Sequence, residues 1–176
     1  MNRILAVLFL FAVSLASAAE DKLTTQALAA LAQQSEPLPV SLQFQQKKHL
    51  SGLPRVLVSS GQLDISKDEI IWTTEHPQQQ QLRINRQGIF EQGSDTSISG
   101  SETVAMLLLA ILQQDDVVLK RLFKLSLKQN CVVMTPKEEA LGSVIEKIHS
   151  CGTDSVELVT LFEQSGNTTR IELSKR

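Results

Sequence analysis

Apolar and polar residues alternate with a period that changes along the chain. Residues 21–34 (DKLTTQALAALAQQ) carry Leu and Ala at helical spacing, which predicts a helix that ends before the prolines at 37 and 39. From Val40 the period becomes two, because Val40, Leu42 and Phe44 alternate with polar residues, as in a half-buried strand. Further strands are predicted within residues 55–66, 70–74, 81–85, 88–92, 123–128, 131–135, 143–150, 155–163 and 168–173.

The turns between these segments are short and polar, which limits how the strands can pair. Parallel neighbours need crossovers of about a dozen residues or more, so neighbouring strands are expected to be antiparallel. The pattern predicts a mainly β (α+β) protein with one strongly curved antiparallel sheet of about ten strands and two or three helices.

The middle of the chain differs from the rest. After a polar loop at 93–102, nine consecutive apolar residues run from Val104 to Leu112. Their Ala, Met and Leu content favours a helix, with Ser101 as N-cap, and a second short helix is predicted to start at Asp115 or Asp116. A helix that is apolar all round must be covered on both sides, either as an ordinary buried helix or as a movable cover.

The N-terminus has the pattern of a secretory signal peptide. Arg3 precedes an apolar run from Ile4 to Val13, followed by the small residues ASAA. The run is much shorter than the roughly 20 residues that span a bilayer, although a membrane anchor is the alternative. We expect cleavage after Ala18 or Ala19, with residues 1–18 as signal peptide and 19–176 as one domain.

Charge and composition narrow the possible partners. The chain has 17 basic and 19 acidic residues, a net charge of −2, which gives no indication of nucleic-acid binding. Its only histidines, His49, His76 and His149, lie in no nucleophile, triad or zinc-ligand motif, so we expect neither catalysis nor a metal or other cofactor.

The two cysteines, Cys131 and Cys151, are expected to form a disulfide in an oxidising compartment. Two unpaired thiols are the alternative.

The order of these segments resembles the LolA family, the periplasmic carriers of outer-membrane lipoproteins. SLQFQQKKHL (41–50) is similar to the family's first strand, and VVMTPK (132–137) to a strand and turn near its C-terminus. In SSGQLDISKDEIIWTTEHP, Gly61, Leu63, Ile70 and Trp72 occupy the places of the family's most recognisable motif.

The resemblance implies an incomplete barrel with helices over its open side and an apolar hollow for acyl chains. Trp72, the only tryptophan, would be a wall of that hollow. The alternative is that the same side chains fill a dry core. The expected cavity residues are Phe44, Leu63, Ile65, Ile70, Trp72, Leu82, Ile84 and Phe90, and the expected lid residues are Met106, Leu108, Leu109 and Ile111.

One departure from the family pattern concerns the turn before the tryptophan strand. The family has arginine and proline there, and that arginine is implicated in holding the lid closed. Here the turn reads SKDE, so Lys67 is the candidate latch, and its ammonium lacks the planar fork of arginine.

The implied function is a periplasmic, monomeric carrier for lipoprotein transport in outer-membrane biogenesis. It would bind the acyl chains of a lipoprotein or other lipid, taking the cargo from an inner-membrane transporter and delivering it to an outer-membrane acceptor. The alternative is a periplasmic sensor or interaction protein that detects lipids or lipoproteins with the same fold.

Overall fold

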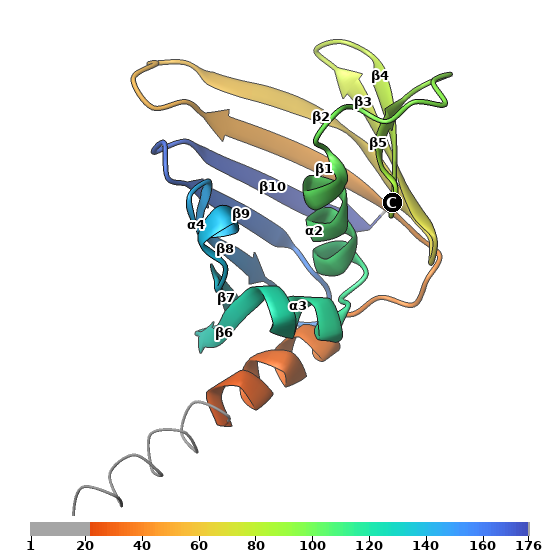
Figure 1. The fold of residues 1–176 in the computed structure, drawn as a ribbon. Helices are drawn as coiled ribbons and strands as arrows, with labels where there is room; N and C mark the ends of the chain where they lie inside the picture. Colours follow the sequence, from red (N-terminus) through yellow and green to blue (C-terminus); the bar gives the residue numbers. More distant parts are fainter. Residues whose placement is uncertain (1–21, 176) are drawn as a thin grey trace, which may run out of the picture.

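The computed structural model describes residues 22–175, so the predicted signal peptide at 1–18 lies outside the described residues. These residues contain one ten-stranded sheet with the order β5-β4-β3-β2-β1-β10-β9-β8-β7-β6, in which all neighbours are antiparallel (Figure 1). The strands are β1 (Val40–His49), β2 (Val56–Ile65), β3 (Glu69–His76), β4 (Gln80–Asn85), β5 (Gly88–Glu91), β6 (Phe123–Lys128), β7 (Cys131–Pro136), β8 (Ile145–Cys151), β9 (Leu158–Glu163) and β10 (Thr168–Lys175).

The sheet is strongly curved but open. Its two end strands, β5 and β6, do not pair with each other, and α2 (Glu102–Leu112) lies in the concave side (Figure 1). A helix through residue 33 and α3 (Asp116–Leu122) lie together at the lower end of the sheet in this view. The predicted mainly β fold, with helices over the open side of an incomplete barrel, is confirmed.

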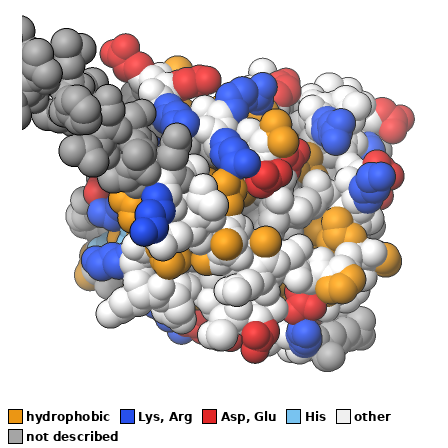
Figure 2. Space-filling model, turned by 90° about the horizontal axis from the view of Figure 1, so that it is seen from below, with side chains coloured by type: hydrophobic (Ala, Val, Ile, Leu, Met, Phe, Trp, Pro, Cys, Tyr) orange, Lys and Arg blue, Asp and Glu red, His pale blue; other side chains and the backbone are white. Residues whose placement is uncertain are grey.

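The core lies between the concave face and the helices. It contains side chains of the sheet and of three helices, including Leu42 and Phe44 of β1, Ala27 and Leu31 of the first helix, Leu109 of α2 and Leu119 of α3. The face seen from below carries apolar side chains as separate small groups between charged and polar ones (Figure 2). No helix within residues 22–175 is long and apolar enough to cross a membrane.

Two local predictions differ from the structure. The segment PKEEALG, expected only to separate strands, contains the single-turn helix α4 (Glu139–Gly142), which is too short to produce a helical period. The segment 155–163 becomes a strand only at Leu158, because the chain bends tightly after Cys151. There, a Cβ on Gly152 would collide with the carbonyl oxygen of Ser155, so the bend requires glycine.

Candidate functional site

The concave face is lined by two rows of apolar side chains that cross β2, β3 and β4. Antiparallel register places Leu63 opposite Trp72 and Trp72 opposite Leu82, and Ile65, Ile70 and Ile84 form the neighbouring row. Four of these six side chains, Leu63, Ile65, Ile70 and Ile84, are at most 2% exposed, while Trp72 and Leu82 are partly buried against the same core. Strand periodicity therefore puts six of the eight predicted cavity residues side by side.

Phe44 extends these rows onto β1. Its ring centroid lies 4.9 Å from that of Trp72, with the two planes tilted by 55°, which is a favourable aromatic geometry. Trp72 thus links the first strand to the middle of the concave face. Its ring is partly buried against the core, so it is not an isolated surface aromatic.

Phe90 does not share this face. It pairs with Arg83, not with Leu82 or Ile84, and the Arg83 guanidinium lies 4.4 Å from the centre of its ring. Phe90 is buried but stays outside the main core cluster, while its neighbour Ile89 packs against that cluster. On β5, the inward position is therefore Ile89.

The helix α2 occupies the space in front of these rows. Leu108 and Ile111, two predicted lid residues, face Leu63 and Trp72 across a remaining apolar cavity of only about 30 Å³, whose far side is formed by β9 and β10. A cavity of this size holds about one water molecule. The side chains of α2 therefore leave almost no open space between the helix and this part of the concave face.

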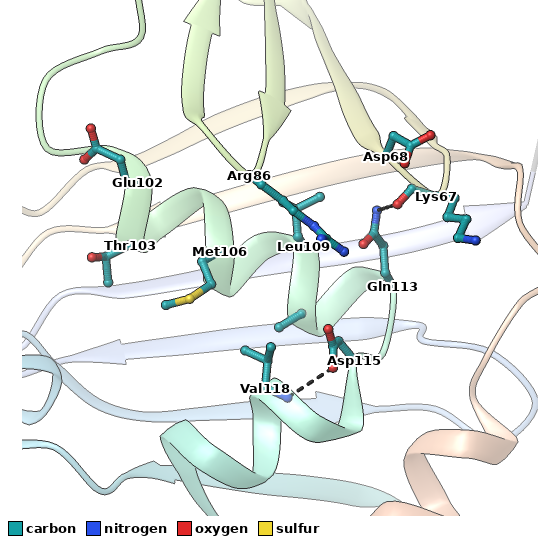
Figure 3. A pocket seen from close by; sticks show the side chains of 11 residues that line it. Lys67, Asp68, Arg86, Glu102, Thr103, Met106, Leu109, Gln113, Asp115 and Val118 are labelled. Carbon is teal, nitrogen blue, oxygen red and sulfur yellow. Dashed lines mark hydrogen bonds between the residues drawn. The ribbon is translucent and has the colours of Figure 1, made fainter.

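The opposite side of α2 borders a wider cleft of about 450 Å³ (Figure 3). Met106 and Leu109, the other two predicted lid residues, form part of its apolar wall. Arg86 reaches from the β4–β5 turn towards Leu109 and Gln113, and Lys67 and Asp68 of the β2–β3 turn stand at the rim. The helix α2 is therefore packed closely on the side of Leu108 and Ile111 and borders an open cleft on the other, and Val104 near its start is 49% exposed.

A side-chain amide at the end of α2 ties the helix to the sheet. Gln113, the C-cap residue, donates from Nε2 to the carbonyl oxygen of Ser66 at 2.7 Å. It also donates to the carbonyl oxygen of Lys67 at 3.3 Å (Figure 3). Ser66 is itself fixed, because its Oγ donates to the carbonyl oxygen of Glu69 at 2.9 Å.

The contact at Lys67 differs from the one expected of a basic latch. Its carbonyl accepts the bond from the helix, and its ammonium makes no hydrogen bond or ion pair within residues 22–175. Sequence reasoning missed Gln113, whose only signal is that an amide side chain directly follows the apolar run.

The junction between α2 and α3 is built for a sharp change of direction. Gln114 has a φ of 55°, in the left-handed region, and Asp115 caps α3 by accepting a hydrogen bond from Val118 N at 3.1 Å. This confirms the predicted start of the second helix. The chain therefore forms two separate helices here, and α2 ends before α3 begins.

The start of α2 is not capped by its serine as predicted. Ser101 precedes the helix in αR conformation and makes no side-chain cap bond. Its Oγ instead accepts a hydrogen bond from Ile89 N at 2.9 Å, which joins the start of the helix to β5.

The histidines lie apart, on β1, β3 and β8. Burial lowers the pKa of His149 below its usual 6.5, and the charges of Lys147 and Lys128 lower it further. Its ring packs on Phe162 at 5.0 Å between centroids. Within the described residues, no group of three or more His, Cys, Asp or Glu side chains is placed to hold a metal ion.

The predicted disulfide is formed. Cys131 and Cys151 are directly opposite each other on β7 and β8, and their sulfur atoms are bonded. It lies at one end of this strand pair, next to the bend at Gly152.

Comparison with known proteins defines the class of protein to which this site belongs. The family model described as outer membrane lipoprotein carrier protein LolA matches residues 39–176. The chain belongs to the LolA family. No curated protein matches the sequence.

Solved structures show distant likenesses. A LolA superfamily protein from Nitrosomonas europaea is 9% identical, with a TM-score of 0.48, over 86% of this chain and 91% of that one. A putative outer membrane lipoprotein-sorting protein domain from Vibrio parahaemolyticus is 9% identical, with a TM-score of 0.42, over 89% and 92%. A chain of the Pseudomonas aeruginosa MucA/MucB complex is 12% identical, with a TM-score of 0.49, over 85% of this chain and 56% of that one.

Proposed function

We propose that this protein is a periplasmic carrier that shelters the acyl chains of a lipoprotein, or of another lipid, between the inner and outer membranes. The chains would take the place of α2 on the concave face. No covalent step and no cofactor is needed, because transfer follows from the relative affinities of donor, carrier and acceptor. An inner-membrane transporter would supply the cargo and an outer-membrane acceptor would receive it.

The observation that supports this proposal most directly is the packing of α2 on Trp72 and Leu63. The helix side chains that face this wall, Leu108 and Ile111, are apolar, as is the wall itself. Each methylene group removed from water contributes roughly 0.8 kcal/mol, so an acyl chain gains on this surface what the helix gains. The free energies with which the helix and an acyl chain bind this wall can therefore be similar, so that one can replace the other.

The attachment of α2 also supports an exchangeable cover. The amide of Gln113 provides a neutral hydrogen bond to the β2–β3 turn, and such bonds contribute only about 1 kcal/mol net. The chain turns at Gln114, between the C-cap of α2 and the start of α3, which would let α2 shift while α3 stays folded. We infer that cargo enters by displacement of α2 from the concave face.

The test is native mass spectrometry of protein purified from its own periplasm, followed by lipid extraction. A co-purified acylated species supports the carrier. A protein that is free of lipid and also fails to bind a fluorescent fatty acid contradicts it.

Two single substitutions distinguish an effect on the binding site from the general effect of adding a charge. Leu108→Glu is expected to raise fatty-acid affinity several-fold, because a charge on α2 weakens its packing on the apolar wall and so lowers the free energy needed to displace the helix. Val117→Glu on α3 is the matched control, since Val117 is 71% exposed and remote from the concave cavity. Equal affinity of both variants, with both folded, would remove the concave face as the binding site.

A further inference from the structure

The turn between β1 and β2 carries an unusual group of exposed apolar side chains. We call residues 50–58 the hairpin tip. Leu53, Val56, Leu57 and Val58 are each about half exposed, at 52%, 50%, 54% and 49%. Other exposed large apolar residues of the described chain, such as Val117 on α3 and Val144 between α4 and β8, are separate from one another in sequence.

The hairpin tip is exposed because it extends past its neighbours. β2 pairs with β1 from Val56 onwards, but β3 joins it only at Ser60, where the register also shifts. Residues 56–59 therefore have a strand on one side only, and the loop projects at the upper left of Figure 1. The tip is held in place, since Ser51 N donates to Asn167 Oδ1 at 2.9 Å.

The apolar side chains point to both faces of the hairpin. Val56 and Val58 lie on one face and Leu57 on the other, because side chains alternate along a strand. A partner protein docked on one face would leave the other in water. A lipid interface surrounds an inserted tip and covers both faces together.

The hairpin tip itself carries one basic residue, Arg55, and no acidic residue. No acidic residue occurs between Glu36 and Asp64, while Lys47, Lys48 and Arg55 lie in that interval. Lys47 and Lys48 form exposed ion pairs with Glu172 and Glu163, at 3.6 Å each. Arg55 makes no ion pair or hydrogen bond within residues 22–175, so its guanidinium is available to a lipid phosphate.

We propose that the hairpin tip inserts into the interface of a membrane that contains anionic phospholipid, and so docks the protein directly on a bilayer. Leu53 and residues 56–58 enter the boundary between headgroups and acyl chains, and Arg55 contacts phosphate. This docking does not require cargo in the concave face, and it holds whether or not the carrier function does.

Vesicle flotation of the mature, cargo-free protein tests the proposal. Vesicles of phosphatidylglycerol and phosphatidylethanolamine should carry the protein, and pure phosphatidylcholine vesicles should carry several-fold less. Leu53→Gln combined with Leu57→Gln should reduce the bound fraction by about tenfold. The matched control, Val117→Gln with Val144→Gln, removes two apolar side chains elsewhere that are even more exposed, at 71% and 60%, and should leave binding unchanged.

The contribution of Arg55 and the insertion of the tip into the membrane interface are tested separately. Arg55→Gln should reduce binding to the anionic vesicles several-fold, and raising NaCl from about 50 mM to about 500 mM should do the same. In a Trp72→Phe background, Leu53→Trp should give blue-shifted emission with the anionic vesicles, because its indole enters the interface.

The proposal is overturned if the protein binds neither vesicle, or if the hairpin and control variants lose binding equally. It is also overturned if the hairpin variants bind vesicles normally but no longer associate with a partner protein, since the tip would then be a protein-docking surface. Fatty-acid binding by the hairpin variants should stay normal, which separates this test from that of the carrier function.

Discussion

Gln113, at the end of α2, donates a hydrogen bond from Nε2 to the carbonyl oxygen of Ser66 over 2.7 Å. The two residues are 47 positions apart in sequence, and their bond connects α2 to the turn that follows β2. Through this bond the turn holds the helix that covers the apolar wall around Trp72.

Gln113→Ala should loosen α2 while the sheet stays intact. Loss of this amide removes about 1 kcal/mol of docking free energy, so amide hydrogen exchange in residues 105–113 should become several-fold faster. Gln164→Ala is the control, because Gln164 donates the same kind of bond, 2.8 Å to the carbonyl of Gly142, far from α2 in sequence. If hydrogen exchange in α2 is unchanged in the Gln113→Ala variant, Gln113 does not hold the helix in place.

Asp115 and its neighbour Asp116 should differ in their effect on stability. Asp115→Ala removes the cap of α3 and should cost about 1 kcal/mol of unfolding free energy. Asp116→Ala removes only an exposed ion pair with Lys120 and should cost less than about 0.5 kcal/mol. Urea denaturation measures both, and equal effects would argue against the cap.

The disulfide should contribute strongly to stability. It closes a loop with a sequence separation of 20, for which chain entropy gives about 3 kcal/mol. Cys131→Ser with Cys151→Ser should therefore lower the urea midpoint clearly, whereas adding a reductant to this double variant should change nothing further. A double variant as stable as the parent would mean that the bond adds no stability.

His149 should make the protein less stable in mildly acidic solution. Burial lowers its pKa in the folded state below the usual 6.5, so the unfolded chain binds the proton more readily. Above pH 6.5 neutral His149 costs no stability. As the pH falls from 6.5 towards the lower pKa of the folded state, unfolding becomes more favourable, because the unfolded chain takes up the proton first. His149→Gln should flatten the dependence of unfolding free energy on pH in this interval.

The carboxylates act in a different pH range. Hydrogen bonding from Asn167 lowers the pKa of Glu163 below its usual 4.5, so the stabilisation it provides is lost only in more acidic solution.

The His149 prediction is contradicted if the His149→Gln variant still loses stability between about pH 7 and 5. The loss of stability would then come from another group.

Much of the sheet could be predicted from sequence because strand periodicity is local. Alternation predicts that Ile70 and Trp72 share one face, and the resemblance to the LolA family adds Leu63 to it. In the structure Leu63 lies directly opposite Trp72. Phe90 could not be placed in this way. The turn at residues 86–87 has two residues, so Ile84 pairs with Ile89, and Phe90 falls on the other face with Arg83.

The contacts of the lid depend on geometry that no local pattern contains. The apolar run at Val104–Leu112 predicts a covered helix, but the bond from Gln113 to Ser66 depends on where two distant turns meet. Ser101 is a similar case. Its hydroxyl was expected to cap α2, but Ile89 N lies close enough to donate to it.

The measurement that tests the central claim most directly is hydrogen exchange of the protein with and without a bound acylated peptide. If acyl chains replace α2 on the wall around Trp72, exchange in residues 105–113 should rise on loading. Exchange in β1 and β10 should stay the same or slow. Saturable binding of the peptide with α2 equally protected in both states, or no binding at all, would contradict a carrier whose cover is this helix.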